Sequence, residues 1–215
     1  MKVGIIGSGI VGRVLATAFL KEGNEVMLGT RDTSKEDVVK WKAENTHGNT
    51  GSFAETAAFG EVLVLATGGL VSETAIQLAG IENFSGKTII DATNPIAAAP
   101  PVDGVLQFFT GPNESLMEKL QVLLPKANFV KAFNSVGNAM MYKPHYNGVK
   151  PTMFICGNSD EAKKTVSGIL NSFGWEAADF GKAASARAIE PLAMLWCIRG
   201  FNNNQWTHAF KLLQQ

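Results

Sequence analysis

The chain has 215 residues, of which 46% are hydrophobic and 18% are charged. This composition is typical of a globular protein of one or two folding units, and it excludes a disordered chain. Basic and acidic side chains number 19 each and form no basic stripe. A nucleic acid or an anionic membrane is therefore not the expected partner, and a small molecule is.

The cysteines and the first residues indicate the compartment. Cys156 and Cys197 lie far apart in apolar stretches, and we expect both to be buried thiols of a reducing compartment. Residues 1–20 resemble a signal peptide in hydrophobicity, but their glycines, Arg13 and the lack of a small-residue cleavage site argue against one. No apolar run reaches the roughly 18 residues of a membrane span. We expect a cytoplasmic protein.

Predicted strands and helices alternate along the first two thirds of the chain. The strands are runs of Val, Ile and Leu without polar alternation, which indicates a parallel sheet covered by helices on both faces. Strands are predicted over residues 3–6, 25–28, 48–53, 61–66, 87–91 and 128–132, and helices over residues 11–21, 34–44, 71–79 and 114–124. Thr33 or Ser34 is expected to cap the second helix.

The remaining residues predict a strand over 151–157, a helix over 160–173, a strand over 176–180 and closing helices over 183–196 and 204–213. Pro191 should kink or break the first closing helix. The predicted fold is α/β, a Rossmann doubly wound parallel sheet with a small C-terminal α-helical or α/β extension. We assign residues 1–142 to the nucleotide-binding domain and residues 143–215 to an extension that contributes to a substrate site or a dimer.

A glycine-rich turn follows the first strand. Gly7-Ser8-Gly9-Ile10-Val11-Gly12 matches G-x-G-x-x-G between a predicted strand and a predicted helix. Gly7 permits the tight turn, Gly9 allows a pyrophosphate to approach the backbone, and Gly12 allows close packing of helix on strand. The helix N-terminus offers free N–H groups to the phosphates. This pattern predicts a dinucleotide site, and glycines placed for packing alone are the alternative.

The residues at the end of the second strand distinguish an NAD site from an NADP site. An NAD site expects an acidic residue there, whereas a 2′-phosphate needs a nearby cation. The chain reads Thr30-Arg31, with Lys35 one helical turn further on, so NADP(H) is the predicted cofactor. Asp32 complicates this prediction. If the strand-end position lay two residues further along, an acidic residue would occupy it, as in an NAD site. A solvated Arg31–Asp32 pair is the alternative.

Three further strand ends should border the ligand, since ligands on open α/β sheets lie beyond the carboxyl ends of the strands. They are Ala66-Thr67-Gly68, Asn94-Pro95 and Asn134, and their small or amide side chains suit a ribose or a carboxamide. A turn role is the alternative for each. The Asn94–Pro95 bond is a candidate cis peptide, although most such bonds are trans.

No acid–base constellation of a hydrolase and no metal-ligand spacing occurs in the sequence. His47, His145 and His208 are scattered and are expected at the surface or in capping positions. Lys131, at a strand end, is the one candidate general acid, with a solvent-facing orientation as the alternative. Hydride transfer needs little acid–base help, so it fits this sequence best.

The sequence resembles the NADP oxidoreductase family that includes the coenzyme F-420 dependent NADP reductases, with the reductase domain of the STEAP metalloreductases in the same wider group. The resemblance lies in residues 7–12, 29–31, 66–67, 91–95, 131–134 and 190–196. It implies a Rossmann domain with a small C-terminal domain, NADPH bound through Thr30 and Arg31, a homodimer, and hydride exchange with a deazaflavin.

The redox acceptor stays open. Asn134-Ser135-Val136 departs from the His-Thr-containing segment associated with the deazaflavin enzymes. A flavin-like acceptor should lie in an apolar slot, for which Trp196, Phe201 and Trp206 are candidate walls, with a core or dimer role as the alternative. A reductase of an imine or β-hydroxyacid and a non-catalytic NADPH sensor are the competing functions.

Overall fold

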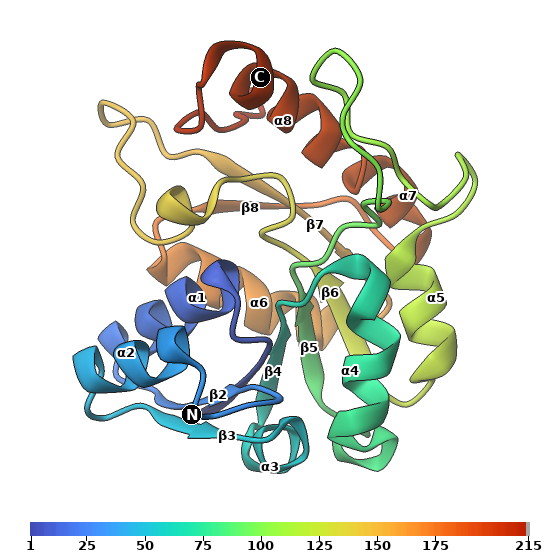
Figure 1. Ribbon diagram of the computed structural model, residues 1–215. Helices are drawn as coiled ribbons and strands as arrows, with labels where there is room; N and C mark the ends of the chain where they lie inside the picture. The colour runs from blue at the N-terminus through green and yellow to red at the C-terminus, as the bar shows by residue number, and fades with distance from the viewer. Residues whose placement is uncertain (214–215) are drawn as a thin grey trace.

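The computed structural model describes residues 1–213, and within them eight strands form one sheet in the order β3-β2-β1-β4-β5-β6-β7-β8 (Figure 1). The first six of these positions have the order of a Rossmann sheet. The strands are β1 (Lys2–Ile6), β2 (Glu25–Gly29), β3 (Asn49–Gly51), β4 (Val62–Leu65), β5 (Thr88–Asp91), β6 (Asn128–Lys131), β7 (Thr152–Gly157) and β8 (Glu176–Asp179).

The sheet is parallel from β3 to β6, as predicted, but β7 runs antiparallel to β6. The chain between β6 and β7 contains only a short 3₁₀ turn (Asn138–Met140) and no crossover helix. The chain therefore re-enters the sheet at the end where β6 stops, so that β7 runs in the opposite direction to β6. β8 then pairs parallel to β7, with α6 (Asp160–Ser172) as the crossover.

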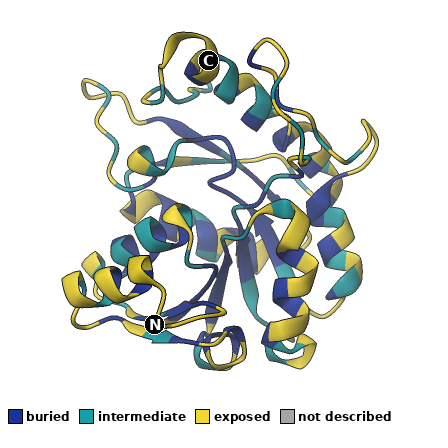
Figure 2. Ribbon diagram, viewed as in Figure 1, coloured by how far each residue is buried: buried dark blue, intermediate teal, exposed yellow. Residues whose placement is uncertain are grey.

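Helices cover both faces of the sheet. On one face, α1 (Ile10–Lys21), α6 and Trp41 of α2 (Glu36–Glu44) pack on the buried strands; on the other lie α3 (Phe53–Phe59), α4 (Ser72–Ala79) and α5 (Leu116–Leu123) (Figure 1). Every residue of β4 is buried, and so is every residue of β1, β5 and β6 except the first (Figure 2). This burial on two faces explains why their sequences do not alternate.

The predicted strand over residues 48–53 is wrong at its end. β3 stops at Gly51, and Ser52 caps α3, a helix that the sequence analysis missed. The Ser52 hydroxyl accepts from the N–H of Glu55, whose carboxylate accepts from the N–H of Ser52 in return. The Ser-x-x-Glu spacing was the available signal. The predicted cap of α2 is also wrong, because α2 begins after Lys35 and has no side-chain cap.

The two closing helices differ from the prediction. The first is split at Pro191, as expected, into α7 (Ala186–Ile189) and α8 (Leu192–Asn203), and α8 continues past Trp196. The predicted helix over residues 204–213 is wrong. Asn204 adopts a left-handed conformation (φ 53°) that ends α8, and the chain then runs beside β7, where the Thr152 N–H donates to Phe210 O at 2.9 Å.

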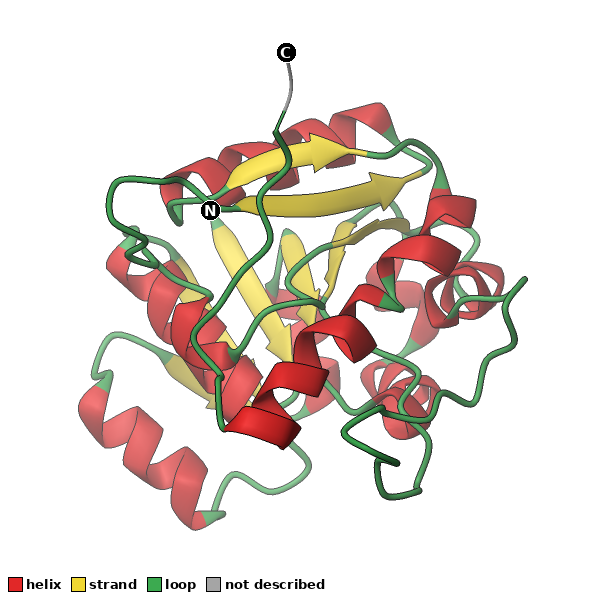
Figure 3. Cartoon of the chain, turned by 90° about the horizontal axis from the view of Figure 1, so that it is seen from above, coloured by secondary structure: helices red, strands yellow, loops and turns green. Residues whose placement is uncertain are grey.

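The C-terminal helices lie over the carboxyl ends of the parallel strands. Seen from above, α8 crosses this end of the sheet, and the chain after it passes over the loops that follow the strands (Figure 3). Gly137, in the loop after β6, lies against the ring of Trp196 and the carbonyl of Trp206. α8 and the chain after it, as far as residue 213, therefore border the end of the sheet where the candidate site lies.

Candidate functional site

The glycine-rich turn has the backbone that the sequence predicts. Gly7 has φ +123°, and a Cβ there would lie 2.5 Å from the carbonyl oxygen of Ala66. A Cβ on Gly12 would overlap the carbonyl oxygen of Gly7, so α1 can approach β1 only with glycine at this position. At Gly9 nothing lies within 4 Å of the Cβ position. The turn is thus closed on the protein side and open on its outer side.

The first turn of α1 lacks the groups that usually satisfy a helix N-terminus. Its N-cap is Gly9, no side chain caps it, and no acidic residue lies in its first turn. The early N–H groups of Ile10 and Val11 face outward with the positive end of the helix dipole. A dianionic pyrophosphate is the ligand that this arrangement fits.

The end of β2 supplies the polar groups beside this turn. Thr30 is buried and accepts a hydrogen bond from the Ser8 hydroxyl at 3.0 Å. Arg31 and Lys35 are exposed. The Asp32 carboxylate accepts from the Ser34 hydroxyl at 2.6 Å and from the Ser34 N–H at 2.8 Å, and these bonds lower the pKa of Asp32. Asp32 is therefore engaged in a local turn, while both cations are free to meet an anion.

These segments meet in one cleft of about 290 Å³. It brings together nine of the predicted binding residues: Gly7, Ser8, Gly9, Thr30, Arg31, Lys35, Ala66, Thr67 and Gly68. It also includes six residues that the sequence analysis did not select: Asp32, Phe53, Val71, Thr74, Ala75 and Leu78. Most of these six belong to α3 or α4, and they form the apolar wall of the cleft. Helical spacing from Val71 to Leu78 was the only sequence signal for that wall.

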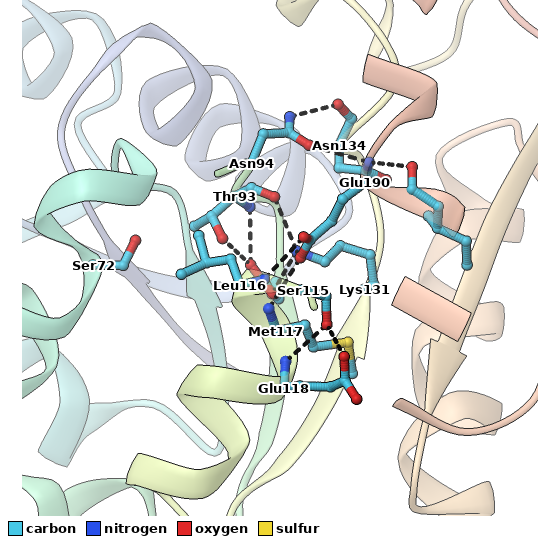
Figure 4. Close-up of polar contacts among 12 residues, drawn as sticks. Ser72, Thr93, Asn94, Ser115, Leu116, Met117, Glu118, Lys131, Asn134 and Glu190 are labelled. Carbon is cyan, nitrogen blue, oxygen red and sulfur yellow. Dashed lines mark hydrogen bonds and ion pairs between the residues drawn. The ribbon is translucent and has the colours of Figure 1, made fainter. Parts of the chain in front are cut away.

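The other predicted binding residues lie outside this cleft. Ile10, Val11 and Gly12 form the start of α1, next to it. Asn94 and Asn134 form a separate pair: the Asn94 side-chain amide donates to Asn134 O at 2.8 Å, and the Asn134 amide donates to Asn94 Oδ1 at 3.2 Å (Figure 4). Pro95 follows this pair, and its peptide bond is trans, as are all those of residues 1–213.

Next to the amide pair lies a buried ion cluster, formed by Asp91, Lys131 and Glu190. Figure 4 shows Lys131 and Glu190 of this cluster together with Asn94 and Asn134. Lys131 Nζ lies 2.7 Å from Asp91 Oδ2 and 2.9 Å from Glu190 Oε1. It also donates to the carbonyl oxygen of Thr93 at 2.9 Å. Burial opposes the charge on Lys131, but the two carboxylates outweigh it and raise the pKa of this amine. The ammonium thus has three partners and keeps its proton.

This arrangement contradicts both hypotheses for Lys131. Its side chain has no exposed surface, so it does not point into solvent. An amine held by two carboxylates and a carbonyl, away from the cleft, does not serve as a general acid. The sequence did not place Glu190 beside Lys131, because 59 residues separate them in the chain and only tertiary packing, of α7 on α5 and on β7, brings them together.

The C-terminal aromatic residues form one group. Trp196 is buried, and its ring centroid lies 5.6 Å from that of Trp206, which lies 5.3 Å from Phe201. His208 stacks on Trp196 at 5.0 Å. Phe201 is half-exposed, so the group extends from the loop after β6 to the surface. Of the other histidines, His47 and His145 are exposed, as expected.

The cysteines do not take part in the cleft. Both thiols are free; Cys156 is buried, and Cys197 is partly buried. Burial raises the pKa of Cys156 to about 12 and also raises that of Cys197. Within residues 1–213, no group of His, Cys, Asp or Glu is arranged to hold a metal ion, and no helix is long and apolar enough to cross a membrane.

Fold and cleft together define the class: a Rossmann-type protein with the glycine-rich turn of a dinucleotide site. The family model for NADP oxidoreductase, coenzyme F420-dependent, matches residues 2–95. A crystal structure from Arthrobacter sp. FB24, provisionally assigned as an F420-dependent NADP reductase, is 30% identical with a TM-score of 0.92, and each chain covers all of the other. The chain belongs to this family and is an NADP-dependent oxidoreductase.

Two further relatives are similar to this chain over most of its length. The F420-dependent NADP reductase of Methanocaldococcus jannaschii is 28% identical over 205 residues, which are 91% of this chain and 90% of the relative. Metalloreductase STEAP3 of Rattus norvegicus is 31% identical over 202 residues, which are 90% of this chain but only 37% of the relative. The predicted family, the α/β Rossmann fold and NADP(H) as cofactor are thereby confirmed.

Proposed function

We propose that the protein transfers a hydride between NADP(H), bound in the cleft at the glycine-rich turn, and a deazaflavin of the F420 type or a flavin-like acceptor. The observation that carries this proposal is the cleft itself, in which the open turn at Gly9 adjoins Thr30, Arg31 and Lys35. The bound nicotinamide supplies the hydride chemistry, and the protein sets distance and orientation.

The 2′-phosphate is the group that Thr30, Arg31 and Lys35 would hold. Arg31 offers a planar fork of donors and Lys35 a second positive charge. The Asp32 carboxylate, turned to Ser34, is not offered to a ribose hydroxyl as the acid of an NAD site would be. The pyrophosphate would lie on residues 7–12 and on the start of α1.

Asn94, Pro95 and Asn134 would hold the nicotinamide end, with Ala66, Thr67 and Gly68 between the two ends. Asn134 is 5% exposed, and its Oδ1 has no hydrogen-bond partner among residues 1–213. A buried amide oxygen without a donor is costly, and a carboxamide N–H of the cofactor is a donor of the matching kind. We assign this contact to Asn134.

The acceptor, the extension and the assembly complete the proposal. The names of the Arthrobacter and Methanocaldococcus relatives support an F420-type acceptor. Residues 143–215 would form a smaller extension beside the acceptor, where Trp196 and Trp206 lie. The half-exposed side chains of Leu195 and Phe201 on α8 support a homodimer, and the two free thiols support a cytoplasmic location.

The test is an acceptor screen. Purified protein is given NADPH with an oxidised deazaflavin, FMN, riboflavin, a ferric chelate or a cyclic imine, and the loss of NADPH absorbance is followed. The deazaflavin or a flavin should give the fastest oxidation, with NADH much slower than NADPH. Oxidation with the imine alone would replace the proposal by an imine reductase. Tight NADPH binding without oxidation by any acceptor would indicate a sensor.

A further inference from the structure

The buried ion cluster of Asp91, Lys131 and Glu190 joins three separate parts of the fold. Asp91 and Lys131 are the last residues of the neighbouring strands β5 and β6. Glu190 comes from the break between α7 and α8, in the C-terminal extension. Its Oε2 accepts from the N–H of Leu116 at 2.9 Å and its Oε1 from that of Met117 at 3.0 Å, so it also caps the start of α5 (Figure 4).

The two strand-end loops leave the sheet directly from this cluster. Asp91 Oδ1 accepts from the N–H of Thr93 at 2.9 Å and from its hydroxyl at 2.6 Å, and Lys131 holds the carbonyl of the same residue. Both the N–H and the carbonyl of Thr93 are therefore held by hydrogen bonds, which fixes the backbone between Asp91 and Asn94.

The amide pair above the cluster is tied to the same elements. Asn134 donates to the carbonyl of Ile189, the neighbour of Glu190, at 3.0 Å, as well as to Asn94. Both donor directions of the Asn134 amide are thus taken by protein atoms, and the unpartnered Oδ1 is left in one orientation. That orientation depends on where Glu190 places Ile189.

We infer that Asp91, Lys131 and Glu190 are positioning residues, which hold the Asn94–Asn134 amide pair in register with the C-terminal extension and thereby orient the nicotinamide end of the cofactor. A buried ion cluster stabilises a fold poorly compared with apolar packing of the same volume, because desolvation offsets the attraction. A need to hold the Asn94–Asn134 pair in one fixed arrangement would explain why the ion cluster is present. The inference rests on the proposed nicotinamide site at Asn94 and Asn134.

The test compares two ligands that share one end. NADPH reaches both the cleft and the amide pair, whereas 2′,5′-ADP carries only the adenosine phosphates and reaches only the cleft. The variant is Glu190→Gln, which keeps the side-chain shape and leaves Lys131 paired with Asp91. The matched control is Arg187→Met, which removes an exposed ion pair, to Glu118 at 2.7 Å, between the same helices α7 and α5. Affinities are measured by calorimetry, and the emission of bound NADPH reports the nicotinamide ring.

In Glu190→Gln, the affinity for NADPH should fall by about tenfold or more, and the ring emission should shift toward that of free NADPH. The affinity for 2′,5′-ADP should stay that of the wild type, and Arg187→Met should behave as wild type with both ligands. Equal losses for both ligands would reduce the cluster to a general structural role, and unchanged NADPH binding and emission would refute the inference. If the wild type binds neither ligand, the proposed cofactor site is wrong and the inference falls with it.

A second variant covers a failure of the first to fold. Asp91→Asn, Lys131→Met and Glu190→Gln combined remove the buried ammonium together with both carboxylate charges, so that no uncompensated charge stays buried, and the same two ligands are compared. The expected result is again a loss confined to NADPH. Retained discrimination between NADPH and 2′,5′-ADP at the wild-type level would overturn the inference.

Discussion

The Ser8 hydroxyl donates to Thr30 Oγ1 across 3.0 Å and so joins the glycine-rich turn to the end of β2. The Thr30 hydroxyl in turn bonds Asp32, accepting from its N–H at 3.2 Å and donating to its carbonyl at 3.1 Å. The segment proposed for the pyrophosphate and that proposed for the 2′-phosphate are therefore held at a set separation before any ligand binds. Such preorganisation lowers the ordering cost of binding.

Arg31→Ala should weaken NADPH binding by about 1.5–3 kcal/mol, the scale of a hydrogen bond to a charged group, because the 2′-phosphate loses its forked donor. NADH, which lacks that phosphate, should bind as in the wild type. Calorimetric titration with both nucleotides checks this prediction. The control is Arg199→Ala, which removes an exposed guanidinium whose one hydrogen-bond partner among residues 1–213 is Gln205, and it should change neither affinity. Equal losses for NADPH and NADH in Arg31→Ala would contradict the assignment.

Gly9→Ala and Gly12→Ala should separate binding from folding. The protein leaves room for a Cβ at Gly9, so Gly9→Ala should melt like the wild type but bind NADPH poorly, since the methyl group occupies the outer face of the turn. At Gly12 the Cβ would overlap the Gly7 carbonyl, so Gly12→Ala should lower the free energy of unfolding by about 1–3 kcal/mol or more. Thermal melts and NADPH titrations of both variants provide the test. Normal NADPH affinity in Gly9→Ala would place the pyrophosphate elsewhere.

Lys131→Met should destabilise the protein by about 3–5 kcal/mol, because two buried carboxylates lose their cation. Changing Asp91→Asn and Glu190→Gln as well should recover much of this loss, since no uncompensated charge then remains. Urea unfolding of the single and triple variants measures the difference. A single variant as stable as the wild type would mean that water reaches the cluster.

Cys156 should make stability depend on pH in the alkaline range. The thiol has an ordinary pKa of 9.0, which burial raises to about 12 in the folded state. Between these values the unfolded state has released the proton and the folded state has kept it, so the free energy of unfolding should fall as the pH rises above 9. Urea unfolding at neutral and alkaline pH should show a smaller fall in Cys156→Ala than in the wild type. Identical falls in both proteins would exclude this thiol as a cause.

Local signals sufficed where an element is defined by its own residues: the glycine turn, the apolar strands and the break at Pro191 lie where they were expected. Local signals failed where tertiary contacts with residues distant in the sequence determine the secondary structure. Residues 204–213 have the composition of a helix, but Trp206 packs over Gly200 and Trp196. The chain then runs beside β7, to which Phe210 is hydrogen-bonded through Thr152. α3 is also defined by its own residues, because the Ser52–Glu55 capping box is visible in the sequence.

The amino-acid sequence alone determined the Rossmann fold, the glycine turn and the preference for NADP(H), because each depends on residues close together in the chain and on backbone sterics. Tertiary structure alone decided that Asp32 turns to Ser34, that α4 provides an apolar wall, and that Lys131 is a buried cation rather than an acid. The physical reason is that a buried charge is defined by its partners. Asp91 and Glu190 lie within 3 Å of Lys131 in the folded protein, where all three side chains are buried by strand and helix packing.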